Sequence, residues 1–260
     1  MSASASYSAK RLHDPFTVYI LLNEPLTFRV NEILVALRQD YPGLSWSDTL
    51  EFDGLVDTAQ FGLGLMVADG GEMREAGPIS FATLPGRCEV GWEHVLKTSF
   101  NSFPDAAQAV AQHVSYLAIN VPSLDGTLAA RFDAARRVTC IGAIFAKLPI
   151  CVGVYNPSAD LIVSPKGWVE AAATAMAAKV PYLQWISFGV RPVPDGGTPV
   201  PVTVQSIGLA AFPGFEVATL KARLPAEEVL RYTYAGCAMV MEHGFEFRDG
   251  DTLGREAGGE

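Results

Sequence analysis

The sequence predicts an α+β protein with mainly antiparallel sheet, helices packed on one face of the sheet, and a central strand–helix–strand unit. Residues 114–121 are apolar at nearly every position, which is typical of a strand covered on both faces. Residues 127–147 carry small and apolar side chains at alternating spacings of four and three, which places them along one helix face. Residues 150–155 return as a short buried strand. The helix face is predicted to consist of Leu128, Phe132, Ala135, Thr139, Gly142 and Ala146.

The chain before this unit predicts a strand, a helix and then a meander of strands. Residues 16–22 are rich in β-branched and aromatic side chains, which favour a strand. Thr27 can cap the N-terminus of the helix, and the Tyr-Pro-Gly sequence at residues 41–43 ends it. The inner face of this helix is predicted to consist of Val30, Ile33, Leu34 and Leu37.

The meander is predicted from runs of alternating residues bounded by glycine, aspartate and proline. Two of its strands form a hairpin around a turn at residues 69–75. Residues 85–104 predict either a short helix or an irregular loop. The strands are expected at 44–50, 60–68 and 78–84, and a further helix at 105–112.

After the central unit, the sequence predicts two more helices among short strands. Ser164 and Pro165 predict a helix start, because proline at the first helical position loses no needed donor, and Pro181 ends this helix. The last helix begins at Pro225 and ends before Gly244. Strands are expected at 161–163, 183–190, 202–212, 215–220 and 245–247, with a flexible flap at 191–201.

The length of 260 residues allows one large domain or two compact ones. We expect a disordered leader at 1–14, an N-terminal α+β part at 15–110 and a C-terminal α+β part at 111–255, with one continuous domain as the alternative. The leader lacks the apolar stretch of a secretory signal. The longest apolar runs also fall short of the ~20 residues that a membrane helix needs.

The composition favours a cytoplasmic protein with a substantial core and no cofactor. Hydrophobic residues make up 49% and charged residues 18% of the chain. The net charge of −9 disfavours binding to nucleic acid and permits a basic protein partner. The cysteines show no C-x-x-C spacing, which indicates reduced and buried thiols. They are Cys88, Cys140, Cys151 and Cys237.

Four C-terminal segments together carry a likeness to a known family. They are Trp-Ile-Ser-Phe at 185–188, Ile-Gly-Leu-Ala-Ala-Phe-Pro-Gly-Phe-Glu at 207–216, an alanine-rich helix near Ala235, and Asp-Gly-Asp-Thr-Leu-Gly at 249–254. In these segments the chain resembles the bacterial family named domain of unknown function 4261, which has no established activity. Some members of that family look like neighbours of secretion-system toxin genes. The resemblance therefore implies a toxin-neutralising role.

The sequence predicts no metal site. Asp249 and Asp251 alternate in Asp-Gly-Asp-Thr, but an EF-hand loop would need further oxygen ligands and a distal glutamate. We expect this motif to be a turn, because Asp and Gly supply side-chain-to-backbone bonds and positive φ angles. No two histidines have the i, i+4 spacing of a zinc site, and there is no H-E-x-x-H. The histidines are His13, His94, His113 and His243.

Residues 88–94 contain the one cluster of side chains that could form a catalytic site. Cys88, Glu93 and His94 could form a non-standard hydrolase or transferase site if the thiol were activated. The Gly-Leu-Gly sequence at 62–64 lacks the third glycine and the following helix of a dinucleotide site. No phosphate-binding loop or nucleophile elbow occurs, so no catalytic residue is predicted and the enzyme reading remains the alternative.

The preferred hypothesis is a non-catalytic binding protein of the immunity type, whose partner is a basic toxin domain or effector. Three loop segments are expected to contact it, because loops commonly carry recognition. Trp92 is the first candidate anchor, although it could instead be a core residue that covers the sheet. The predicted partner-binding residues are Trp92, Glu89, Glu93, His94, Asp69, Glu72, Arg191 and Asp195.

Overall fold

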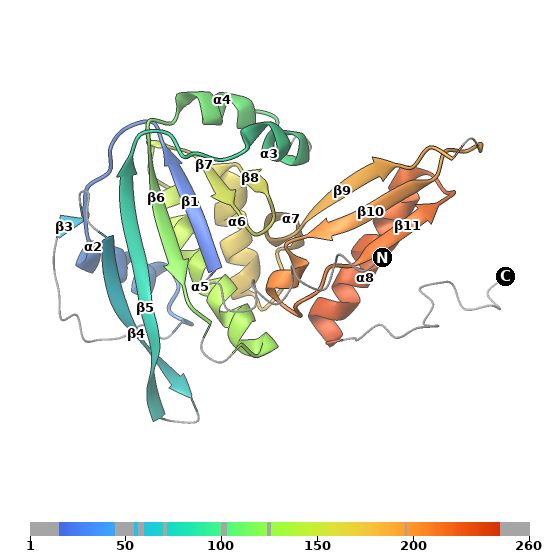
Figure 1. Cartoon of the computed structure of the whole chain (residues 1–260). Coiled ribbons are helices and arrows are strands. Elements are labelled where there is room, and N and C mark those ends of the chain that lie inside the picture. Colours follow the sequence, from blue (N-terminus) through green and yellow to red (C-terminus); the bar gives the residue numbers. More distant parts are fainter. Residues whose placement is uncertain are drawn as a thin grey trace.

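A six-stranded antiparallel sheet in the order β4-β5-β6-β1-β7-β8 forms the centre of the molecule (Figure 1). The predicted α+β class is thereby confirmed. The computed structural model describes residues 16–44, 55–56, 60–69, 72–99, 103–123, 126–195 and 197–244. For 55–56, 60–69 and 72–78 it describes the backbone alone. The strands of the sheet are β1 (Phe16–Leu22), β4 (Gln60–Asp69), β5 (Glu72–Pro85), β6 (Ser115–Val121), β7 (Cys151–Asn156) and β8 (Leu161–Val163).

The predicted strand–helix–strand unit is β6, α5 (Leu128–Ala146) and β7. Both strands pair antiparallel with β1, so they run parallel to each other with β1 between them. Thr127 caps α5, because its hydroxyl accepts a hydrogen bond from the amide of Ala130 at 3.2 Å. Strands from before and after residue 110 therefore interleave in one sheet.

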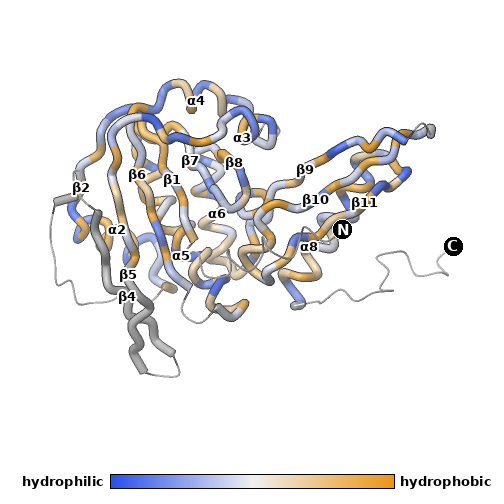
Figure 2. Tube along the Cα trace, viewed as in Figure 1, coloured by the Kyte–Doolittle hydropathy of each residue, from blue (hydrophilic) through white to orange (hydrophobic). Residues whose placement is uncertain are grey.

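The main core lies between one face of this sheet and three helices, α2 (Val30–Asp40), α5 and α6 (Pro165–Met176). Figure 2 shows hydrophobic residues along the central strands that supply it. The residues predicted for the inner face of α2 are all buried. In α5, the predicted Ala135, Thr139, Gly142 and Ala146 are buried, while Phe132 packs against the core in a half-buried position. A two-stranded sheet of β2 (Phe28–Arg29) and β3 (Leu55–Val56) completes this side.

The helices do not all lie on one face of the sheet, which corrects that part of the prediction. Helices α3 (Trp92–Ser99) and α4 (Ala106–Gln112) cover the opposite face, where a second cluster of buried residues forms. Successive side chains of a strand point to opposite faces. In β1, Ile20 therefore joins the main core while Leu21 joins the second cluster. Because both faces of β1 are apolar, both need a helical cover.

The C-terminal part forms an arm that projects from the main body (Figure 1). We define the arm as the three-stranded antiparallel sheet, in the order β11-β10-β9, together with the last helix, which packs against it. The arm strands alternate hydrophobic and hydrophilic residues (Figure 2). Its elements are β9 (Ser187–Pro192), β10 (Val202–Ile207), β11 (Ala218–Ala222) and α8 (Ala226–His243).

Several predicted boundaries are confirmed where a local capping signal exists. Ser164 caps α6 by accepting from the amide of Gly167 at 3.1 Å, with Pro165 in the first turn. Helix α8 follows Pro225 and ends at Gly244, which adopts a left-handed conformation with φ of 62°.

Other boundaries were predicted wrongly. Helix α2 begins at Val30 after Arg29, not at Thr27, and the carboxylate of Glu32 accepts from the Arg29 amide at 3.4 Å. The predicted strand at 183–190 is instead the short helix α7 (Tyr182–Trp185) followed by β9. The predicted strand at 202–212 ends at Ile207, and the 3₁₀ helix η1 (Leu209–Ala211) follows.

Some predictions concern residues that the structure does not describe. The leader, the strand at 44–50, the strand at 245–247 and the motif containing Asp249 and Asp251 lie outside the described residues. The turn predicted at 69–75 is shorter than expected, because β4 extends to Asp69 and β5 begins at Glu72.

Candidate binding surfaces

Trp92 is the first residue of α3 and lies half-buried on the second cluster. Its indole N–H donates to the carbonyl of Cys88 at 3.0 Å. The centroid of its ring lies 5.2 Å from that of Tyr155 and 5.7 Å from that of His113, both in edge-to-face arrangement. With its polar group satisfied and its ring packed, Trp92 covers the sheet rather than standing free as an anchor.

Cys88 and His113 form a structural pair. The Cys88 amide donates to Nε2 of His113 at 3.0 Å, so Nδ1 carries the ring proton and donates to the Val110 carbonyl at 2.7 Å. The His113 ring is fully buried. Burial raises the pKa of the Cys88 thiol to about 11, which leaves it protonated and unreactive at neutral pH. The pairing links the segment before α3 to the end of α4.

Glu89, Glu93 and His94 lie on the exposed side of the α3 region. Glu93 accepts a hydrogen bond from Lys97 at 2.8 Å, and this bond lowers the pKa of the carboxyl. His94 is exposed while Cys88 is buried, so the three residues of the alternative enzyme site do not share one environment. Their arrangement gives the thiol no activating base.

Arg191 and Asp195 belong to the arm, at the end of β9 and in the loop that follows. The predicted flexible flap is tied at its tip: Arg223 donates to the Asp195 carboxylate at 2.6 Å and to the Pro199 carbonyl at 3.0 Å. The Val193 amide also donates to the Pro201 carbonyl at 2.8 Å. Arg191 is exposed and forms no ion pair with any described residue.

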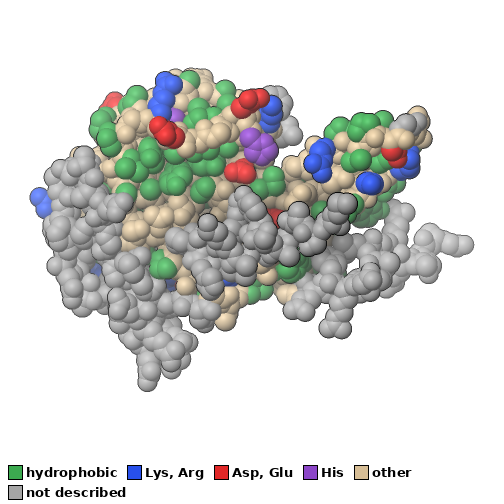
Figure 3. All heavy atoms as spheres, in the orientation of Figure 1, with side chains coloured by type: hydrophobic (Ala, Val, Ile, Leu, Met, Phe, Trp, Pro, Cys, Tyr) green, Lys and Arg blue, Asp and Glu red, His purple; other side chains and the backbone are tan. Residues whose placement is uncertain are grey.

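The three predicted contact segments do not form one surface. Helix α3 and the arm lie on the same side of the molecule, while the β4–β5 hairpin that carries Asp69 and Glu72 points toward the other end (Figure 1). Helix α3 also lies against β9. Figure 3 shows the surface hollowed between the body and the arm on this side, with lysine and arginine side chains grouped on the arm.

The arm and the helix that leads into it carry most of the exposed large hydrophobic side chains. Seven of the nine found among the described residues lie between 183 and 234, and the other two are Val35 and Val114. Such clustering is typical of an interaction surface, whereas single exposed hydrophobic residues are ordinary. The seven are Leu183, Val190, Val200, Phe215, Leu220, Leu224 and Tyr234. Sequence reasoning missed most of them, because exposure in a short strand depends on which face the neighbouring helix covers.

Strand register separates the two faces of the arm sheet. Val204 is buried and lies opposite Thr219, whose hydroxyl is hydrogen-bonded to that of Thr233 on α8 at 2.8 Å. This face is therefore covered by α8. Leu220 follows Thr219 and by alternation points to the open face, where it is 70% exposed. Arg191 lies opposite Thr203, also on the open face.

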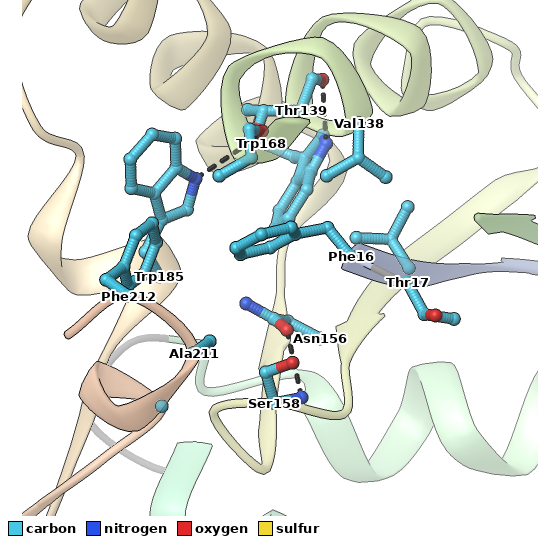
Figure 4. A pocket seen from close by; sticks show the side chains of 13 residues that line it. Phe16, Thr17, Val138, Thr139, Asn156, Ser158, Trp168, Trp185, Ala211 and Phe212 are labelled. Carbon is cyan, nitrogen blue, oxygen red and sulfur yellow. Dashed lines mark hydrogen bonds between the residues drawn. The ribbon is translucent and has the colours of Figure 1, made fainter. Parts of the chain in front are cut away.

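An aromatic cluster joins the arm to the body. Phe212, just after η1, stacks on Trp185 with ring centroids 5.4 Å apart and also contacts Phe16 and Phe132 at 5.4 and 5.2 Å. Figure 4 shows the rings of Phe212, Trp185 and Phe16 beside a cavity of about 20 Å³, which has room for about one water molecule. This cavity is too small for a substrate.

The segment 207–216, one of those that carry the family resemblance, has a structural role. The partly buried carboxylate of Glu216 accepts hydrogen bonds from the Ser206 hydroxyl and from the amides of Gly208 and Ala210 at the start of η1. Gly208 has a φ of 103°, and a Cβ there would lie 2.7 Å from the Trp185 carbonyl oxygen. The motif thus shapes the junction between body and arm.

The comparisons with known proteins add no function. Neither models of protein families, nor curated proteins, nor solved structures gave a significant match to this chain. Among the described residues, no helix is long and apolar enough to cross a membrane. No cluster of three or more potential metal-ligating side chains occurs in the same part of the chain.

Proposed function

We propose that this chain is a non-catalytic binding protein that holds a protein partner against the open face and tip of its arm. The observation that carries the proposal is the exposure of Leu220 on the open face and of Val200 in the loop at the tip, on an arm that carries most of the exposed large hydrophobic side chains among the described residues. The aromatic junction at Phe212 and the salt bridge at Arg223 hold this surface in a defined shape. A preformed surface loses less conformational entropy on binding.

Charge gives the partner two expected properties. The net charge of −9 favours fast, salt-sensitive association with a basic protein. On the arm itself, Arg191 and Lys221 are exposed and form no ion pair with any described residue. The contact patch of the partner is therefore expected to place carboxylates opposite them, within a surface that is basic overall.

Neutralisation of a secretion-system toxin in the cytoplasm is the biological role that we propose for such a surface. This part rests on the resemblance of the C-terminal segments to domain of unknown function 4261. The basic partner would be a toxin domain or effector encoded beside this chain. The alternative of a hydrolase or transferase gains no support from the geometry, because the pKa of Cys88 is raised and its histidine partner is bound to the backbone.

The test is to titrate the purified chain with the product of the neighbouring gene and to measure binding by isothermal titration calorimetry. We expect a one-to-one complex, and we expect Leu220→Asp to weaken it by about tenfold or more, the scale of a lost apolar anchor. Val35→Asp is the matched control, because Val35 is 54% exposed on α2, far from the arm (Figure 1). Circular dichroism would verify that both variants fold.

Two results would contradict the proposal. Equal affinity of the Leu220→Asp variant and the unmodified chain would remove the arm as the binding surface. Absence of any complex with the neighbouring product would remove the toxin-neutralising role.

A further inference from the structure

A groove of about 880 Å³ lies between α5, α6 and α8, where the arm meets the body. This volume is within the ~300–1,000 Å³ typical of sites for small organic molecules. Aromatic side chains from three elements line it: Phe132 of α5, Tyr182 and Trp185 of α7, and Tyr234 of α8. The groove is separate from the open face of the arm, since α8 lies between the two.

The aromatic side chains form two adjacent pairs. The ring centroids of Tyr182 and Tyr234 are 5.2 Å apart, and those of Phe132 and Trp185 are 6.2 Å apart. The Tyr182 hydroxyl donates to Glu242 at 2.9 Å, which fixes the direction of the ring. Walls of this kind favour a flat apolar body, because ring faces and edges pack well against another aromatic ring.

The charges of the groove are unevenly matched. Asp133 accepts from Nη2 of Arg136 at 2.7 Å and from Nε of Arg137 at 2.6 Å, so one carboxylate serves two guanidinium groups. Nε of Arg136 is buried and has no hydrogen-bond partner in the described part of the chain. A buried donor without a partner is costly, so an added acceptor that reorients this side chain would be favoured.

Lys179 adds a cation that no described carboxylate pairs with. It lies in the loop after α6, is exposed at the groove, and forms no ion pair with the residues that the structure describes. The remaining carboxylate, Glu242, already accepts the Tyr182 hydroxyl. When Arg137, which shares the Asp133 carboxylate, is counted, three cations accompany the two carboxylates of the groove.

We propose that this groove binds a small organic anion with a flat aromatic body, such as an aromatic carboxylate. The ring packs against the two aromatic pairs, and the carboxylate accepts hydrogen bonds from Arg136 and Lys179. Binding would use side chains of both body and arm, so the ligand also stabilises their junction. The proposal does not depend on the protein-binding role of the arm.

The experiment compares two probes with the same naphthalene ring, the anionic 2-naphthoate and the neutral 2-naphthalenemethanol, by isothermal titration calorimetry on the full chain. We expect the carboxylate to bind about five- to tenfold more tightly than the alcohol, the effect of a partly exposed charge pair. Tyr234→Ala should weaken both probes alike, because it removes a wall and no charge.

The decisive variant is Lys179→Met, which keeps the apolar stem and removes the ammonium group. We expect this variant to lose most of the difference in affinity between naphthoate and the alcohol, because naphthoate binds more weakly while the affinity for the alcohol is unchanged. Lys166→Met is the control, since Lys166 is exposed on α6 and does not line the groove. Equal affinity for the two probes, no saturable binding, or a preference that Lys179→Met leaves intact would each overturn the proposal.

Discussion

At the scale of single residues, Thr139 shows how one residue can join three elements. Its hydroxyl donates to the Ala135 carbonyl at 2.7 Å and accepts from the indole N–H of Trp185 at 2.9 Å, while its carbonyl accepts from the indole N–H of Trp168 at 3.1 Å (Figure 4). The hydroxyl is thus the buried partner that Trp185 needs.

Thr139→Val is expected to lower the free energy of unfolding by about 1–3 kcal/mol, because the shape is kept and the Trp185 N–H loses its partner. Urea denaturation measures the change. Thr174→Val is the matched control: its hydroxyl donates only to the Glu170 carbonyl near the surface, and the expected change is within about 0.5 kcal/mol. Equal effects of the two substitutions would contradict the role of Thr139.

His113 makes stability depend on pH. Burial lowers its pKa below the usual 6.5, and the Arg87 charge acts in the same direction. The unfolded chain therefore binds a proton at this residue more readily than the folded chain. The contribution of His113 to the free energy of unfolding is fully present above pH 6.5. It is lost as the pH falls through the lowered pKa of the folded state.

We expect His113→Gln to be less stable than the unmodified chain at pH 8, and the difference between the two to shrink as the pH falls from 6.5 toward 5. Urea denaturation at several pH values measures it. The comparison with the variant matters, because burial raises the pKa of Glu216 and that residue changes stability with the opposite sign. A difference in stability that stays constant with pH would show that His113 does not cause the pH dependence.

At the scale of elements, α5 is a helix enclosed on almost every side in its second half. Gly142 allows α6 to approach, because a Cβ at this position would lie only 2.7 Å from Nε1 of Trp168. Alanine is favoured over glycine in a helix by ~1 kcal/mol, but overpacking a core costs ~1–3 kcal/mol. The two effects oppose each other at this position.

Gly142→Ala is expected to reduce stability, with the steric cost exceeding the gain in helix propensity. A double-mutant cycle with Trp168→Phe tests the cause, because phenylalanine lacks the indole nitrogen that the new methyl group meets. The cost of Gly142→Ala should be smaller in the Trp168→Phe background. Equal costs in both backgrounds would show that another contact limits the helix approach.

At the scale of the whole molecule, Phe212 is a central member of the aromatic cluster that joins the arm to the body. Phe212 is 3% exposed and contacts Trp185, Phe16 and Phe132. Buried aromatic residues contribute much of the stabilisation at such a junction, and removing one also leaves a cavity. The rigidity of the proposed binding surface therefore depends on this residue.

Phe212→Ala is expected to lower stability by about 3–5 kcal/mol and to broaden or split the unfolding transition, as arm and body uncouple. Calorimetry and urea denaturation followed by two probes would measure both effects. Phe215→Ala is the control, since Phe215 is 37% exposed in the same segment and should change stability little. A single sharp transition at the original midpoint would contradict this account.

The sequence by itself determined the elements that carry their own local signals. The buried strands, the inner face of α2, the helix start at Ser164 and Pro165 and the glycine stop at Gly244 are all present. Periodicity and capping act between residues at most four apart, so they can be recognised without knowledge of the fold.

Only the tertiary structure decided which segments meet. It placed β1 between β6 and β7, paired Cys88 with His113 across 25 residues, and turned residues 182–185 into a helix that directs Trp185 at Thr139. The arm surface and the groove also arise from elements distant in sequence. These contacts join segments that are far apart along the chain, so no local sequence pattern marks them. They are selected by the energy of packing and not by the propensity of each segment.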